Sequence, residues 1–201
     1  EGDYCAIAIG HIDNRGCVVL DAIERIRAGE GDYTDLERLS FDDITDWVYA
    51  LSRKYYIEKG EFDQWAGIPF ETALHDKGLT QCKSVFFTKQ LTSQVFINFK
   101  TLMHEGKLVL FSNPGAGENL VSHAEYLREL CELQCEIHSK YIITVEAPDE
   151  NGKYDDYSDA LVRMVWVATQ HLSKQKYFPG SKGLRGHYSR GMASMSLAKA
   201  M

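Results

Sequence analysis

The fold is decided by one short stretch near the C-terminal end, Asp155-Asp156-Tyr157-Ser158-Asp159-Ala160-Leu161. Apolar residues at helical spacing follow it, which predicts a helix over about residues 156–172. Acids in a first helical turn are favourable, because they cap free N–H groups and interact with the helix dipole. That explains one or two carboxylates, but three repel one another, and a divalent cation would remove the repulsion. The stretch therefore predicts a cation site at the start of this helix.

A second candidate acid, Asp63, ends a predicted short strand and precedes Trp65-Ala66-Gly67. A carboxylate at that end of a strand points into the crevice where α/β sheets bind ligands. Capping of the following turn is an equally good interpretation. Asp156 and Asp159 are three residues apart and share one face of a helix, whereas a helix cap alone can explain Asp155. Mg²⁺ and Mn²⁺ prefer such oxygen ligands, and two ions about 4 Å apart can hydrolyse a phosphodiester.

The rest of the chain predicts a mixed α/β domain. Residues 4–12 and 17–26 are expected to form a hairpin around a turn at residues 13–16. Ser40 and Asp43 have the spacing of a capping box before an amphipathic helix. Strands are expected near residues 56–63, 82–88, 107–111 and 141–146, and helices near residues 70–77, 92–105 and 119–134. This order of elements favours a single sheet flanked by helices.

Charge is distributed unevenly. The 201 residues carry 22 Lys or Arg and 29 Asp or Glu, a net charge of −7. Residues 172–201 hold six of the basic residues and no acid, which leaves 16 basic and 29 acidic groups, or −13, in the rest. The segment 173–201 is therefore expected to be a basic tail on an acidic domain formed by residues 1–172. Such a tail could contact nucleic acid or could simply be solvated.

Other chemistries find no support. The sequence has no GxxxxGK[ST] phosphate loop, no GxGxxG and no GxSxG, so nucleotide binding and serine hydrolase activity are not indicated. Its five cysteines are irregularly spaced and do not suggest a disulfide framework. Cys131 and Cys135 are expected to share a helix face as core thiols. No segment has the length of a membrane span, and a reducing cytoplasm fits best.

Several segments together resemble the nuclease domain of tailed-phage terminase large subunits. Residues 155–161 look like the DDxxDAL motif that closes that domain, and are similar to the DxxDAL ending of RuvC-type resolvases. Residues 62–67 resemble the segment with the second catalytic acid. Residues 2–10 and 18–22 resemble the hairpin after the first catalytic strand, and residues 106–110 also fit. The resemblance spans roughly residues 2–170.

The resemblance implies an RNase H-like fold and a two-metal endonuclease that cuts double-stranded DNA during phage genome packaging in the host cytoplasm. Its implied catalytic and metal-binding acids are Asp63, Asp156 and Asp159, with Mg²⁺ or Mn²⁺ as cofactor. Asp3 resembles an auxiliary acid of the family. Terminase small subunit, portal protein and an ATPase domain in the same full-length chain are the implied partners. The tail would offer DNA contacts from Lys174, Lys176, Lys182, Arg185 and Arg190.

One feature departs from the family. RNase H-like domains begin with three antiparallel strands, and the first carries the leading catalytic acid, yet only two strands are expected before the first helix here. The sequence is expected to start just after that strand, without the leading acid. Asp13 and Asp21 could be proposed in its place, but a turn residue and a strand residue explain them adequately. The alternatives are a non-catalytic module that docks DNA or portal, or another RNase H-like nuclease such as a resolvase.

Overall fold

The computed structural model describes residues 4–64, 67–111, 120–149, 152–175 and 191–197. The strands are β1 (Tyr4–Ile12), β2 (Val18–Arg27), β3 (Ile57–Asp63), β4 (Cys82–Val85), β5 (Leu108–Val109), β6 (Gln134–Ser139), β7 (Ile142–Glu146) and β8 (Gly191–Leu197). The helices are α1 (Phe41–Lys54), α2 (Gly67–Asp76), α3 (Lys89–His104), α4 (Leu120–Glu132) and α5 (Asp156–Gln175), with a short 3₁₀ turn, η1 (Gly31–Tyr33). The mixed α/β class expected from the sequence is confirmed. None of the described helices is long and apolar enough to cross a membrane.

Six strands form one mixed sheet in the order β4-β3-β8-β1-β2-β5. β1 is antiparallel to both β2 and β8, while β3 is parallel to β4 and β8. The predicted hairpin of the first two strands is therefore present. β8 comes from the segment predicted as a basic tail, and its backbone lies between β1 and β3.

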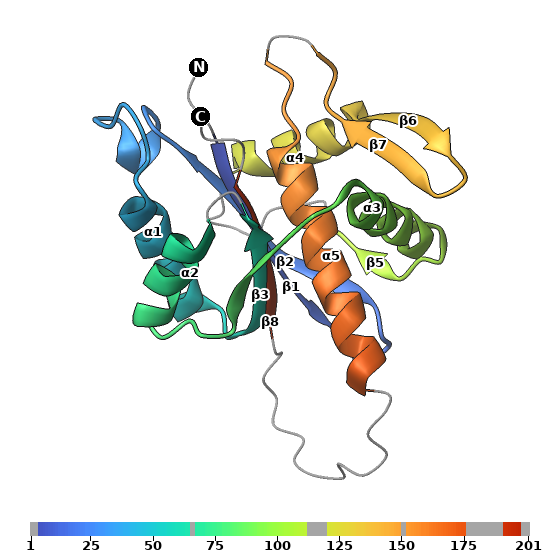
Figure 1. Cartoon of the computed structure of the whole chain (residues 1–201), viewed down its shortest axis with the longest axis horizontal. Coiled ribbons are helices and arrows are strands. Elements are labelled where there is room, and N and C mark those ends of the chain that lie inside the picture. The colour runs from blue at the N-terminus through green and yellow to red at the C-terminus, as the bar shows by residue number, and fades with distance from the viewer. Residues whose placement is uncertain (1–3, 65–66, 112–119, 150–151, 176–190, 198–201) are drawn as a thin grey trace.

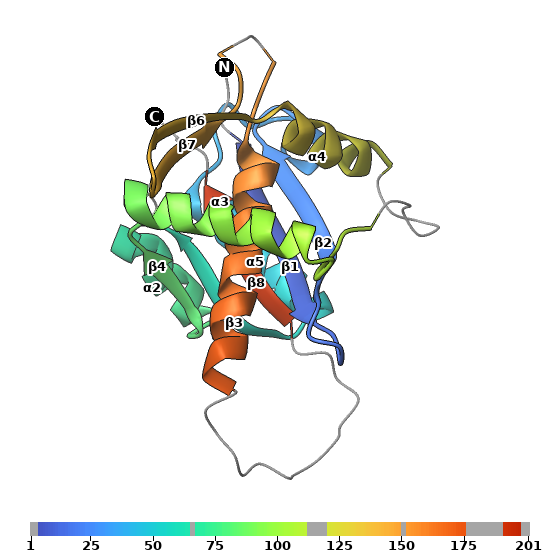
Figure 2. The same ribbon diagram turned by 90° about the vertical axis from the view of Figure 1, so that its right-hand side faces the viewer.

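Helices cover both faces of the sheet (Figure 1). β1 is buried on both sides, so its residues alternate between two cores. Cys5, Ile7 and Ile9 face the core shared with α1 and α2. Ala6 and Ala8 face the core formed with α3, α4 and α5. Small alanines on that face allow α5 to lie directly against β1, and Figure 2 shows α3 crossing over α5.

The start of α1 is fixed by the capping box expected from the sequence. The Asp43 backbone N–H donates to Ser40 Oγ at 3.2 Å, and the Ser40 N–H donates to the Asp43 carboxylate at 2.8 Å. Two of the N–H groups that a helix start leaves free are thereby satisfied.

We expect Ser40→Ala to lower the free energy of unfolding by about 1 kcal/mol, because it removes one half of the box. Urea denaturation followed by circular dichroism would measure this. Thr88→Ala is the matched control, since Thr88 caps α3 through a single bond to the Leu91 N–H. An unchanged midpoint for Ser40→Ala would show that the half of the box made by the Ser40 hydroxyl contributes nothing to stability.

β6 and β7 form a separate two-stranded hairpin that the sequence predicted only in part. β7 lies close to the expected strand, but β6 starts within two residues of the end of α4. Ser93 on α3 holds the hairpin: its hydroxyl donates to the Ile143 carbonyl at 2.9 Å and accepts from the Ile143 N–H at 3.1 Å. The prediction that Cys131 and Cys135 share a helix face in the core is wrong. Cys131 is in α4 and Cys135 in β6, and both are exposed.

Candidate metal centre

Asp63 is placed by the alternation of β3. Phe62, the preceding residue, is buried in the core below α2 and meets Phe70 edge to face, with 5.1 Å between the ring centroids. Successive side chains on a strand point to opposite faces, so Asp63 points to the α5 side of the sheet. It is the last residue of the strand and is only 8% exposed. The prediction that a carboxylate ends this strand is confirmed.

Asp159 is placed by the first turn of α5. The helix begins at Asp156, and the Asp159 N–H donates to the Asp155 carbonyl at 2.8 Å. Ala160 and Leu161, the next two residues, are fully buried against the sheet. Their burial fixes the rotation of the helix, which leaves Asp159 half-buried at the edge of the core, on the side where β3 ends.

A single cation connects the two carboxylates. Arg163, one turn along α5 from Asp159, donates from Nη2 to Asp159 Oδ2 at 2.9 Å. Its Nη1 lies 3.2 Å from Asp63 Oδ2. The guanidinium carbon lies over the face of the Phe87 ring, 4.2 Å from its centre. Two acids that are far apart in the sequence therefore meet around one positive charge.

Negative charge is concentrated here beyond what Arg163 neutralises. Burial raises the pKa of Asp159 to about 6, and the nearby Arg163 guanidinium opposes this rise. Asp155, Asp63 and Glu146, the last residue of β7, each raise the pKa further through like charge. A carboxyl group whose ionisation is disfavoured in this way has much to gain from a second cation.

The donor set fits a hard divalent cation. Asp63 and Asp159 present carboxylate oxygens to a common point, and Mg²⁺ is commonly held by one or two carboxylates together with waters and substrate phosphates. Within the described ranges, no group of three or more His, Cys, Asp or Glu side chains is arranged to hold a metal ion. Asp63 and Asp159 thus offer two carboxylates at one point, and the described residues beside them complete no larger ligand set.

Asp156, the third acid predicted for the site, has different neighbours. It is 5% exposed, and its charge raises the pKa of Cys5 and of Glu129. Glu129 on α4 is also buried, and its Oε1 accepts from the Ser158 N–H at 2.8 Å. Arg25 lies 3.8 Å from the other oxygen of Glu129. Asp156 thus belongs with the groups that hold the start of α5, while Asp63 and Asp159 share Arg163.

The remaining predicted site residues are placed as follows. Asp3 and the tail residues Lys176, Lys182, Arg185 and Arg190 lie outside the described residues, and Lys174 is described only as part of the α5 backbone. Asp13 forms its turn, accepting from the Arg15 and Cys17 N–H groups, and Asp21 pairs with His11. Arg163, Glu129 and Glu146 were not predicted from the sequence. Of these, only Arg163 had a local signal, because it follows Asp159 at the i,i+4 spacing of a helical ion pair.

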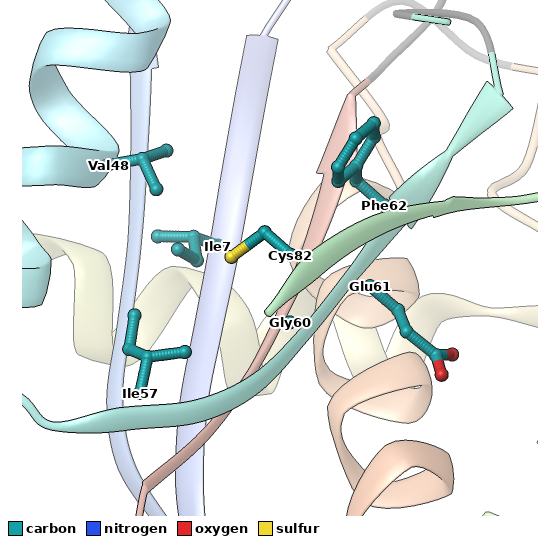
Figure 3. A pocket seen from close by; sticks show the side chains of 7 residues that line it. All are labelled: Ile7, Val48, Ile57, Gly60, Glu61, Phe62 and Cys82. Carbon is teal, nitrogen blue, oxygen red and sulfur yellow. The ribbon is translucent and has the colours of Figure 1, made fainter. Parts of the chain in front are cut away.

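A cavity on the other face of the sheet is not a substrate site. It is lined mainly by apolar groups, among them Ile7, Val48 and Cys82, and its volume is about 10 Å³ (Figure 3). That is barely room for one water molecule. Gly60 forms part of the wall, where its missing side chain leaves space for the Cys82 sulfur.

Comparisons with known proteins identify the fold. No protein family model matches the sequence, and no curated protein matches it significantly. Among solved structures, the chain is similar to the large terminase nuclease from the thermophilic phage G20c, with a TM-score of 0.55 and 18% identity over 81% of this chain and 74% of that one. The same nuclease with bound magnesium matches with a TM-score of 0.55 and 15% identity, over 80% and 72% of the two chains. Its cobalt-bound form matches with a TM-score of 0.51 and 15% identity, over 81% and 79%. The resemblance to terminase nuclease domains is thereby confirmed at the level of the fold.

Proposed function

We propose that this chain is a metal-dependent endonuclease domain that cuts double-stranded DNA during phage genome packaging. The observation that carries the proposal is the meeting of Asp63 and Asp159 around one cation position at the end of β3. The similarity in fold to a large terminase nuclease, of which magnesium-bound and cobalt-bound structures exist, supports it. The mixed sheet, in which β8 lies between the antiparallel pair β1 and β2 and the parallel pair β3 and β4, supports an RNase H-like arrangement.

Each residue has a distinct task in this proposal. Asp63 and Asp159 would hold the ion, Asp63 from a rigid strand and Asp159 from a helix fixed by its buried neighbours. A divalent ion bound there would lower the pKa of an attacking water and neutralise charge on the scissile phosphate. Asp156, buried beside Glu129, would keep the start of α5 in position. If two ions act, part of the second ion's ligands must come from residues beyond those described or from DNA.

Partners follow from the same proposal. Double-stranded DNA is the substrate, and the basic residues of segment 173–201 would contact its phosphates, so binding should weaken as salt rises. An ATPase domain, a small terminase subunit and a portal protein would complete the packaging machinery in the host cytoplasm. The sequence contains no phosphate-binding loop, so the energy for packaging would come from elsewhere in that machinery.

One observation favours a second candidate function. Arg163 already neutralises part of the charge on Asp63 and Asp159, and buried ion pairs of this kind also occur where no catalysis takes place. The chain would then be a non-catalytic module that docks DNA or the portal. The two functions differ in whether the carboxylates are needed for cleavage or only for folding.

Cleavage of supercoiled plasmid DNA in Mn²⁺ separates them. We expect Asp63→Asn and Asp159→Asn each to reduce cleavage at least about 100-fold, since losing even a group that only supports a metal ligand costs about 10–100-fold. Asp46→Asn is the matched control, because Asp46 also pairs with a cation, Lys77, but on the opposite face of the sheet.

DNA binding at low salt and thermal unfolding would be measured on the same samples. Cleavage at the parental rate by both active-site variants would contradict the proposal. No cleavage by the parent, with DNA binding intact, would favour the docking module.

A further inference from the structure

We infer that Arg163 occupies the cation position between Asp63 and Asp159 and competes with divalent metal ions for it. The inference rests on the proposed metal-dependent function, and it assigns to Arg163 a role that the fold does not imply. The guanidinium would act as a resident substitute for the ion, so that its removal exposes two facing carboxylates.

Asp63, Asp159 and Phe87 surround a position that suits a cation. The Arg163 side chain is 9% exposed and lies between the two carboxylates, with its guanidinium carbon over the Phe87 ring. Aromatic faces attract cations, and the attraction is stronger where water is excluded. Three groups from separate elements thus converge on one positive charge: Asp63 ends β3, Phe87 follows β4, and Asp159 is on α5.

The hold on Asp63 is imperfect, which makes Arg163 displaceable. Nη2 makes a hydrogen bond to Asp159, but Nη1 makes an ion pair with Asp63 at 3.2 Å and no hydrogen bond to any described residue. Bidentate pairing, the strongest arrangement of an arginine with a carboxylate, is absent from both contacts. A buried donor without a hydrogen bond costs free energy. A divalent ion carries twice the charge and binds both carboxylates directly.

Electrostatics sets the direction of the effect. While the Arg163 guanidinium lies between the two carboxylates, a metal ion must either displace it or bind beside its positive charge. Both weaken the binding of the metal ion. Without Arg163, the negative charges of Asp63 and Asp159 are left facing each other, and Asp155 and Glu146 add to the negative potential at Asp159. A metal ion that binds there is then attracted by these carboxylates without opposition from the guanidinium. Removing the guanidinium should therefore tighten metal binding even though it destabilises the metal-free protein.

The test measures Mn²⁺ binding to the full chain in the absence of DNA, by isothermal titration calorimetry and by the electron paramagnetic resonance signal of free Mn²⁺. We expect Arg163→Gln to lower the dissociation constant at least tenfold. Arg163→Lys is the matched control: it keeps the positive charge near the site and should bind Mn²⁺ within a few-fold of the parent. The Asp63→Asn, Asp159→Asn double variant should lose the site in either background.

The outcomes distinguish failure of the competition from failure of the metal site itself. If the parent binds Mn²⁺ and Arg163→Gln binds it with equal or lower affinity, the competition is overturned and the metal site stands. No Mn²⁺ binding by parent or variant would overturn both. If Arg163→Gln fails to fold, Phe87→Leu takes its place, because it removes only the aromatic ring over which the Arg163 guanidinium lies. Tighter Mn²⁺ binding by Phe87→Leu supports the competition, and parental affinity overturns it.

Discussion

Gly10→Ala is expected to lower the free energy of unfolding by about 1–3 kcal/mol, the usual cost of forcing atoms into a well-packed core. A Cβ at Gly10 would lie 2.5 Å from the Val19 carbonyl oxygen and 2.6 Å from Met164 Sδ. The first neighbour is the backbone of the paired strand β2, and the second is on α5. Gly10 also sits where the register of β1 and β2 shifts. The alanine must therefore push apart the strand pair, the helix, or both.

Urea unfolding of parent and variant would measure this effect, with Gly60→Ala as a matched comparison. A Cβ at Gly60 meets Cys82 Sγ at 2.6 Å, but the nearest backbone atom of that residue is at 3.5 Å. Truncating the Cys82 side chain removes the close sulfur atom. Adding Cys82→Ala to Gly60→Ala should therefore recover most of the stability that Gly60→Ala loses. The same relief should stay incomplete for Gly10→Ala in Met164→Ala, because the Val19 carbonyl remains. A Gly10→Ala protein within 0.5 kcal/mol of the parent would show that β1 and α5 are loosely packed, against ordinary expectation for a core.

Local sequence signals predicted much of the fold. The box of Ser40 and Asp43 identified the start of α1, and the turn at Asp13 identified the first hairpin. Both depend on bonds between residues within four positions of each other, which a sequence displays directly. Asp63 was located as well, because it follows the apolar Phe62 and precedes a predicted turn that begins at Trp65.

Elements without such signals were missed. β6 is exposed at every position, so it has no alternation of buried and exposed residues, and its boundary with α4 was absorbed into the predicted helix. β8 pairs with β1 and β3, strands more than 100 residues away in sequence. Strand pairing at that distance leaves no local pattern. A tail defined by charge thus contained a strand of the central sheet.

The candidate site shows the same division. The i,i+4 spacing of Arg163 and Asp159 was a local signal of their contact that went unused, and only the folded chain brings Asp63 to the other side of the guanidinium. That contact affects how strongly the site should attract a metal ion. Two carboxylates that share an arginine are already partly neutralised, whereas two carboxylates without one are not. Glu129 is a similar case: on sequence alone it is one polar residue of an amphipathic helix, and its burial against α5 depends on tertiary packing.

Glu129→Gln is expected to remove a pH dependence of stability and to stabilise the protein in alkali by up to about 5 kcal/mol, given about 1.4 kcal/mol for each pKa unit between 4.5 and about 8. Burial raises the pKa of Glu129 to about 8, against the opposing effects of the Ser158 N–H and Arg25. Between pH 4.5 and 8 the folded protein therefore keeps a proton that the unfolded chain releases, and stability falls as the pH rises through this window. Glutamine stays neutral, and its oxygen can still accept from the Ser158 N–H. Parent and variant should be similar near pH 4.5 and diverge up to about pH 8.

Urea unfolding from pH 5 to pH 9 would measure the divergence. Asp159, with its pKa raised to about 6, gives both proteins the same loss of stability at lower pH, so its contribution cancels in the difference. Glu125→Gln is the matched control: Glu125 binds the same Arg25 at 3.0 Å from the same helix, but its side chain is 29% exposed. It should therefore show no comparable gain in alkali. A Glu129→Gln protein that is less stable than the parent at every pH would mean that ionised Glu129 and Arg25 form a net stabilising pair, since breaking such a buried pair leaves Arg25 without its partner.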